Sequence, residues 1–291
     1  MMKKIFFFLS VVAGLVSCKD NSNVETFTSG NTDIMIEESV LPITEDMIKV
    51  FESHYNKASF DMQVMSESHI MNALFKDSGR LAVIPRELTQ KEIDFLAQRA
   101  KPIITPIAKE AIVFIASIQS QDSVIRYDDF ISELKNSSGD KIYVFDNVNS
   151  SLSNQIRKET GISSTGNDVF FLKSTKDVVE YVSKNSKAIG IIGSNWLAQP
   201  DEIVSEHKKN IKNLSVFNNE TNTYVKPTQS TIADGSYPLT RTINIVDTKG
   251  NSGLGKGISS FAASDKGQRL VLKSGLMPIT MPTREIIINQ Q

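Results

Sequence analysis

The chain has 291 residues, a formal net charge of -1 and one cysteine. This charge balance, with no long basic run, argues against nucleic acid as a partner, because phosphate backbones are bound by clustered Lys and Arg side chains. The hydrophobic fraction of 40% is compatible with a globular core, and the length suits one large domain or two medium ones.

The N-terminal residues 1–18 predict a lipoprotein signal peptide that is not part of the fold. A short basic segment precedes an apolar run over residues 5–16, which is too short for a comfortable membrane span. The run ends in Leu-Val-Ser-Cys, which is typical of a bacterial lipobox. We therefore expect Cys18 to be lipidated and to anchor the protein in the bacterial cell envelope. A simple signal peptide with a chance cysteine is the alternative. Residues 19–31 are polar and predict a flexible tether.

Beyond the tether, short strand patterns alternate with amphipathic helix patterns, which indicates an α/β layer architecture. The first part of the chain predicts strands at residues 32–36, 60–65 and 80–85, and helices at 47–55, 70–77 and 90–100. After a crossover at 107–116, strands are predicted at 141–145, 169–172, 188–193 and 213–218, and helices at 127–135, 151–161, 175–183 and around His207. A returning strand at 237–246 and a helix over 261–275 close the chain. The glycine-rich residues 253–257 predict a flexible entry to that last helix, because they lack the spacing of a phosphate-cradling loop.

The most distinctive stretch covers residues 227–245, PTQSTIADGSYPLTRTINI. Asp234-Gly235 is a turn signal, Tyr237-Pro238 favours an extended tyrosine, and the residues that follow alternate as in a half-buried strand. The sequence of this stretch resembles the segment near the hinge of the PstS-like phosphate-binding proteins of ABC transporters. Other stretches match the same family in order: PRELTQKE, IAKEAIVFIAS, KAIGIIGSNWL and FAASDKGQRLVLKSGLMPI.

The resemblance covers about everything after Asn31 and implies the two-lobed type II periplasmic-binding-protein fold, with two crossover strands and an interlobe cleft. It places lobe 1 at residues 32–112 plus 246–291 and lobe 2 at 113–245. Alternation alone would equally allow one continuous α/β sheet. The implied function is capture of phosphate or a related small solute for an ABC importer, by a monomer with no cofactor and no metal. The alternative is a sensor or surface interaction protein that kept the fold with altered or lost ligand binding.

Three predicted helices begin with serine directly after a strand. A helix N-terminus presents unpaired backbone N–H groups and a partial positive charge, and ordinary N-capping is the alternative for any single site. All three starts fall where the family places its ligand loops, two in the first lobe and one in the second, so closure of the lobes would bury a solute. The residues expected to bind it are Ser39, Val40, Ser66, Ser68, Asn149, Ser150 and Ser151.

The third loop departs from the family. Asp146 stands where the family has arginine, and Ser151 and Leu152 replace glycine and threonine. The family's aspartate, which accepts the proton of hydrogen phosphate, falls near Pro85, beside Arg86. Since an isolated buried anion is costly, we predict an exchange of roles, in which Arg86 pairs with the anion and Asp146 accepts its proton. The alternative is that the two residues form a structural ion pair between the lobes or are exposed.

Glu37, Glu38 and Glu67 add negative charge beside two of the loops, which disfavours a bare phosphate and keeps a neutral or amine-bearing ligand open. We expect no catalytic residue, because the sequence has no histidines at metal-ligand spacing, no cysteine in the mature chain beyond the anchor, and no Gly-x-Ser-x-Gly motif. His69, three residues after Ser66, is interpreted as part of a helix start. Trp196, the only tryptophan, is expected to pack on the surface.

Overall fold

The computed structural model describes residues 25–136, 141–161, 168–250 and 252–283. Its strands are β1 Ser29–Glu37, β2 Lys57–Met65, β3 Leu81–Ile84, β4 Ile103–Ser117, β5 Val124–Ile125, β6 Ile142–Phe145, β7 Val169–Phe171, β8 Ala188–Gly193, β9 Ile211–Asn213, β10 Ser215–Asn218, β11 Thr223–Val225, β12 Thr240–Asp247 and β13 Met277–Pro278. Its helices are η2 Glu38–Val40, α1 Leu41–His54, α2 Glu67–Lys76, α3 Gln90–Ala97, α4 Tyr127–Asn136, α5 Ser151–Thr160, α6 Thr175–Lys184, α7 Asn195–Ala198, α8 Glu202–Lys208, α9 Gln229–Ala233, α10 Gly253–Ala263 and α11 Asp265–Lys273.

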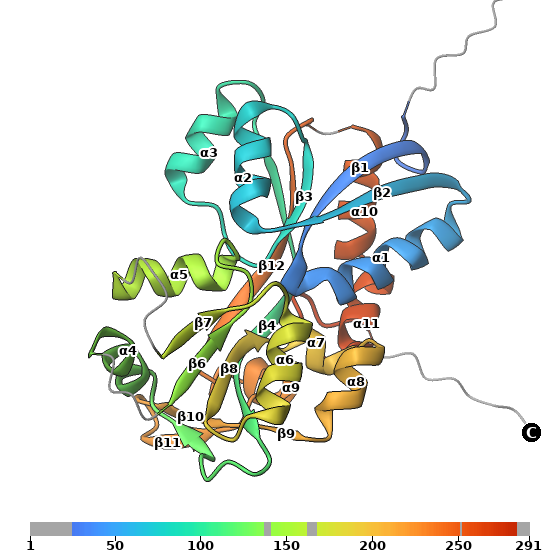
Figure 1. Cartoon of the computed structure of the whole chain (residues 1–291). Helices are drawn as coiled ribbons and strands as arrows, with labels where there is room; N and C mark the ends of the chain where they lie inside the picture. The colour runs from blue at the N-terminus through green and yellow to red at the C-terminus, as the bar shows by residue number, and fades with distance from the viewer. Residues whose placement is uncertain (1–24, 137–140, 162–167, 251, 284–291) are drawn as a thin grey trace, which may run out of the picture.

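The main sheet continues through two lobes in the order β2-β1-β3-β12-β4-β8-β6-β7, and β9 and β13 also pair with β4. Strands β4 and β12 pair antiparallel and are the two connections between the lobes (Figure 1). The first half of β4 pairs with β12 in lobe 1, and its second half pairs antiparallel with β8 in lobe 2. The predicted two-lobed α/β fold with two crossover strands is therefore confirmed.

Each lobe has its own buried core. In lobe 1, α1, α10 and α11 cover one face of β1 and β3, while α2 and α3 cover the other face. In lobe 2, one large cluster joins β4, β6 and β8 to α4, α5 and α6. The central strands β3 and β8 are buried at every position, as expected for strands covered by helices on both sides.

The N-terminal part of the described chain corrects the prediction of a tether over residues 19–31. Residues Ser29 to Asn31 belong to β1 and pair with β2. Just before them, the Glu25 carboxylate accepts a hydrogen bond of 2.7 Å from the backbone N–H of Leu254 at the start of α10. The end of the expected tether is thus fixed against lobe 1. The predicted signal peptide and Cys18 lie outside the described residues.

The glycine-rich residues 253–257 form the first turns of α10, so the prediction of a flexible entry is wrong. The physical reason is close packing, because a Cβ at Gly257 would lie 1.9 Å from the carbonyl oxygen of Phe27. The predicted last helix is in fact two helices, α10 and α11, which meet at Ser264. Several short elements were not predicted, since two to five residues carry no readable periodicity: β5, β11, β13, α7 and α9.

This packing predicts that Gly257→Ala lowers the free energy of unfolding by about 1–3 kcal/mol, since the backbone of Phe27 has to move to admit a methyl group. Ser260→Ala, at an exposed position of the same helix, is the control and is expected to change stability by less than about 0.5 kcal/mol. Urea unfolding monitored by circular dichroism measures both. Equal effects of the two substitutions would contradict the close contact.

Within the described ranges, no helix combines the length and the apolar character that crossing a membrane requires.

Candidate functional site

The candidate site lies between the lobes, where β1 ends in Glu37 and turns through η2 into α1. Glu37 is fully buried, and its Oε2 accepts hydrogen bonds from both the backbone N–H of Ser39, at 3.0 Å, and the Ser39 hydroxyl. The predicted serine-tipped helix start is therefore present. Its donors, however, are directed at a carboxylate of the same loop.

The start of α5 reaches the same carboxylate from lobe 2. The backbone N–H of Ser151 lies 3.5 Å from Glu37 Oε1. Ser150 is the N-cap of α5, since its Oγ accepts a hydrogen bond from the N–H of Ser153. The Ser150 hydroxyl also donates to Asp146 Oδ1 at 2.5 Å, and the Ser153 hydroxyl lies 3.3 Å from the same oxygen. Both lobes thus contribute helix-start donors to one buried position.

Arg241 provides the cation of this site. Its guanidinium makes bonds of 2.8 Å to Glu110 Oε1 through Nε and Nη2, and Nη2 donates to Ser39 Oγ at 2.9 Å. The Arg241 side chain is only 7% exposed, and its Nη1 is buried without a hydrogen-bond partner. Glu110 Oε2 in turn accepts from the backbone N–H of Asn195. Arg241 was not among the predicted site residues.

Three buried carboxyl groups surround this one guanidinium, and burial disfavours their charged forms. Burial raises the pKa of Glu37, while the Arg241 charge and the Ser39 hydrogen bonds oppose the shift. Burial, followed by the negative charge of Glu37, raises the pKa of Asp146 well above its usual range. Burial also raises the pKa of Glu110 against the effect of Arg241. The site is therefore short of positive charge.

Glu38 makes a second contact between the lobes, at the start of α6. Its carboxylate accepts a bond of 2.7 Å from the Thr175 hydroxyl and two of 3.2 Å from the Thr175 N–H. Burial raises the pKa of Glu38 to about 7, although the bonds from Thr175 lower it. The backbone carbonyl of Glu38 accepts from the indole of Trp196 at 3.1 Å. Trp196 is 2% exposed, so the prediction of surface packing is wrong.

The start of α2 in lobe 1 also contacts the start of α5. The backbone N–H of Ser68 donates to the carbonyl of Asn149 at 3.1 Å, and Asn154 Nδ2 donates to the Ser68 hydroxyl. Ser66, the N-cap residue of α2, makes no side-chain capping bond, and its Oγ lies 2.8 Å from His69 Nδ1. Ser66 is buried and His69 is exposed. Among the described residues no carboxylate is hydrogen-bonded to His69, whereas catalysis by a Ser–His pair needs a third group that orients the imidazole.

Arg86 does not reach Asp146. Its guanidinium pairs with Glu67 at 3.0 Å and with both oxygens of Glu92 at 2.8 and 2.9 Å. Glu92 also completes the capping box of α3 with Thr89, which fixes its position. The alternative of an Arg86–Asp146 ion pair is therefore wrong, and the predicted exchange of roles between these two residues stays a prediction.

A crevice of about 330 Å³ opens between the lobes beside the buried site. Lobe 1 lines it with Glu67, Arg86 and Glu92, and α5 of lobe 2 lines it with Ser151 and Lys158, among others. Figure 1 shows α5 directly below α2 and α3. Ser151 both lines this crevice and lies 3.5 Å from Glu37 through its N–H, so the crevice lies next to the buried position.

The structure places the predicted serines at separate contacts around the lobe interface. Ser39 and Ser151 meet at Glu37, Ser68 meets Asn149, and Ser150 donates to Asp146, whereas Ser66 contacts His69 and joins none of these. Their role in binding a solute stays a prediction. Val40 is buried at the start of α1. Arg241, which was not predicted as a site residue, is the last residue of the YPLTR motif in the distinctive stretch 227–245, so the sequence did carry a signal for it.

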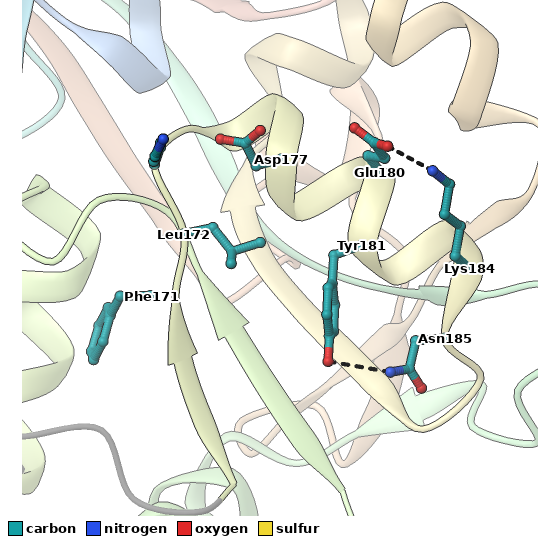
Figure 2. Close-up of a pocket in the computed structure, with 8 residues that line it drawn as sticks. Phe171, Leu172, Asp177, Glu180, Tyr181, Lys184 and Asn185 are labelled. Carbon is teal, nitrogen blue, oxygen red and sulfur yellow. Dashed lines mark hydrogen bonds and ion pairs between the residues drawn. The ribbon is translucent and has the colours of Figure 1, made fainter.

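A separate hollow of about 690 Å³ lies in lobe 2 between β7 and α6. Figure 2 shows Tyr181 beside Asn185, whose Nδ2 donates to the Tyr181 hydroxyl at 3.3 Å, and the Glu180–Lys184 ion pair on the same helix. All of its lining residues come from lobe 2, whereas the site at Glu37 draws donors from both lobes. Across the described part of the chain, no group of three or more His, Cys, Asp or Glu side chains is placed to hold a metal ion.

Two lobes joined by two strands, with helix starts of both facing one buried position, define a binding protein that holds a small solute between its lobes. The profile of the PBP superfamily domain, the periplasmic-binding-protein superfamily, matches residues 21–266, and the chain belongs to this superfamily. It is similar to the phosphate-binding protein PstS of Borreliella burgdorferi, with 26% identity over 96% of this chain and 99% of that protein. It is also 31% identical to the phosphate-binding protein PstS 2 of Streptococcus pneumoniae over 43% of this chain and 37% of that protein.

Solved structures show the same fold. A phosphate ABC transporter substrate-binding protein of Clostridium perfringens with bound phosphate matches with a TM-score of 0.70 and 16% identity, over 86% of this chain and 100% of that chain. An ABC-type phosphate transport receptor of Vibrio cholerae matches with a TM-score of 0.64 and 16% identity, over the same shares.

Proposed function

We propose that this protein is a solute-binding protein that captures phosphate or a related small oxyanion between its lobes for an ABC importer. The observation that carries the proposal is the convergence of donors on one buried position. The N–H and hydroxyl of Ser39 come from lobe 1, the N–H of Ser151 comes from lobe 2, and Arg241 adds positive charge. Oxyanions bind at helix starts for this reason, since the backbone N–H groups and the helix dipole both favour negative charge.

The relatives named as phosphate-binding proteins support this choice of solute. The protein acts by binding and carries out no chemical reaction on the solute. Its delivery partner is an ABC permease. We further propose a lipid anchor at Cys18 in the bacterial cell envelope, with a monomer as the acting form. We place the lobe boundaries a few residues before the predicted ones at 112 and 245. One lies between Ala108 and Ala111 on β4, and the other between Tyr237, just before β12, and Ile243 on β12, because the residues on either side pack in different cores.

Solute binding is tested by titrating the purified protein with phosphate, sulfate and a metabolite library, followed by thermal unfolding and calorimetry. A true solute at 100 times its Kd is expected to stabilise the fold by about 2.7 kcal/mol, which raises Tm by several degrees. No stabilisation by any compound would contradict the proposal and favour a sensor or interaction protein on the same fold.

A matched pair of proline substitutions tests whether the start of α5 belongs to the solute-binding site. Ser151→Pro removes the N–H that faces the site, and proline is tolerated there because Ser151 is the first residue of α5 and Ser150 is extended. The affinity for the solute is expected to fall at least about 10-fold. Glu202→Pro makes the same change at the first residue of α8, outside the site, and is expected to alter the affinity less than about 3-fold. Equal effects of both substitutions would argue against α5 as part of the site.

A further inference from the structure

Glu37 stands in the position that a captured anion would take. Its Oε2 accepts hydrogen bonds from the N–H and the hydroxyl of Ser39 in lobe 1, and its Oε1 faces the N–H of Ser151 in lobe 2. The carboxylate of Glu37 and a free phosphate would accept hydrogen bonds from the same donors, because both present negatively charged acceptor oxygens. The lobes are therefore closed around a side chain of the protein itself.

Arg241 shows that the position is not fully satisfied by this carboxylate. Its Nη2 reaches Ser39 Oγ, whose hydroxyl donates to Glu37, so the guanidinium contacts Glu37 only through the serine. Its Nη1 is buried and has no hydrogen-bond partner, in a side chain that is 7% exposed. A buried guanidinium N–H without an acceptor is costly, and a solute with more acceptor oxygens than a carboxylate would supply one.

We infer that Glu37 is a specificity-determining residue, a tethered competitor that occupies the oxyanion position and must leave it before a free phosphate can bind. This inference rests on the proposed function in one respect, namely that the solute is an oxyanion held by these donors. The crevice between the lobes, which Ser151 borders, lies next to the position that Glu37 occupies. A phosphate that entered beside Glu37 would also lie near the buried carboxyl groups of Asp146 and Glu110, and Arg241 is the guanidinium that contacts this cluster.

The test is calorimetric titration of the purified protein with inorganic phosphate at pH 8. Glu37→Ala is expected to bind phosphate about 10- to 100-fold more tightly than the wild type, since hydrogen bonds to a charged acceptor each contribute roughly this factor. Glu37→Gln keeps the shape of the side chain and removes its charge, so a smaller gain is expected, and this variant also serves if Glu37→Ala does not fold. Circular dichroism checks the fold of each.

Glu38→Gln is the matched comparison, because it removes the same charge from the neighbouring residue at another contact between the lobes. Its gain in phosphate affinity is expected to stay below about 3-fold. If Glu38→Gln raises the phosphate affinity as much as Glu37→Ala does, the inference is overturned, since the loss of any nearby negative charge would then explain the tighter binding. Folded Glu37 variants that bind phosphate no more tightly than the wild type would overturn it as well.

The outcome separates this inference from the proposed function. If the wild type binds no solute of the library and Glu37→Ala binds phosphate, the proposed function is wrong and the role of Glu37 stands. If the wild type binds phosphate tightly and the Glu37 substitutions weaken that binding, the solute-binding function stands and Glu37 is a ligand of the solute instead of its competitor.

Discussion

Arg241→Ala is expected to lower the free energy of unfolding by about 3–5 kcal/mol. The Arg241 guanidinium holds Glu110 through two bonds of 2.8 Å, and Glu110 is fully buried. Without the guanidinium, Glu110, Glu37 and Asp146 are left as buried carboxyl groups with no cation beside them, and an uncompensated buried charge is among the most destabilising changes known. Urea unfolding at pH 7 measures the loss.

Arg80→Ala is the control for the loss of an arginine. The Arg80 side chain is 55% exposed and lies 3.7 Å from Asp77, so its removal is expected to cost less than about 1 kcal/mol. Adding Glu110→Gln to Arg241→Ala is expected to restore part of the stability, because it removes the charge that the first substitution left unpaired. A loss below about 1 kcal/mol in Arg241→Ala would show that the cluster is not held by this cation.

Glu38 is expected to make stability fall as the pH rises from about 4.5 to 7. Burial raises the pKa of Glu38 from 4.5 to about 7, so in this window the folded chain holds a proton that the unfolded chain has released. The stabilising contribution of the protonated carboxyl is complete below about pH 4.5 and is lost as the pH passes through 7. A shift of this size corresponds to about 3 kcal/mol.

The contribution of Glu38 is isolated by comparison with Glu38→Gln. Between pH 4.5 and 8, the free energy of unfolding of the wild type is expected to fall by about 3 kcal/mol more than that of the variant. Glu37, Asp146 and Glu110 also have raised pKa values and are present in both proteins, so the part of their titration that does not depend on Glu38 cancels. The negative charge of Glu38 helps to raise the pKa of Asp146, so that part of the difference also belongs to Glu38. Equal slopes in urea unfolding across this range would show that Glu38 titrates in the folded protein as it does in the unfolded chain.

Most of the fold could be predicted from the sequence because its long elements carry local signals. Strands such as β8 are continuous apolar runs, and helices such as α5 begin at serine and end at glycine, with Gly161 in the left-handed conformation. The serines of the site were found in the same way, as helix starts. The glycines at 253–257 were wrongly predicted to form a flexible entry. Gly257 instead lets α10 pack closely against the backbone of Phe27, and this contact between distant parts of the chain leaves no local sequence pattern.

The chemistry of the site was harder to predict because it depends on pairings across the chain. Arg241 lies 202 residues after Ser39, and only the register of β12 against β4 places it there. Arg86 was expected to face Asp146, but Glu92, six residues away, holds its guanidinium. The negative charge of Glu37 was visible in the sequence, whereas the hydrogen bonds of its carboxylate with Ser39 and its contact with Ser151 depend on the folded loop.

The position of the cation has a consequence for how the lobes separate. Arg241 and Glu110 are directly opposed residues of β12 and β4, the two strands that connect the lobes. Because these strands are where the lobes would hinge, we expect this charge to move less than the helix starts when the lobes separate. If the proposed solute is an anion, we expect it to contact Arg241 in the open form before it contacts the serines of either lobe.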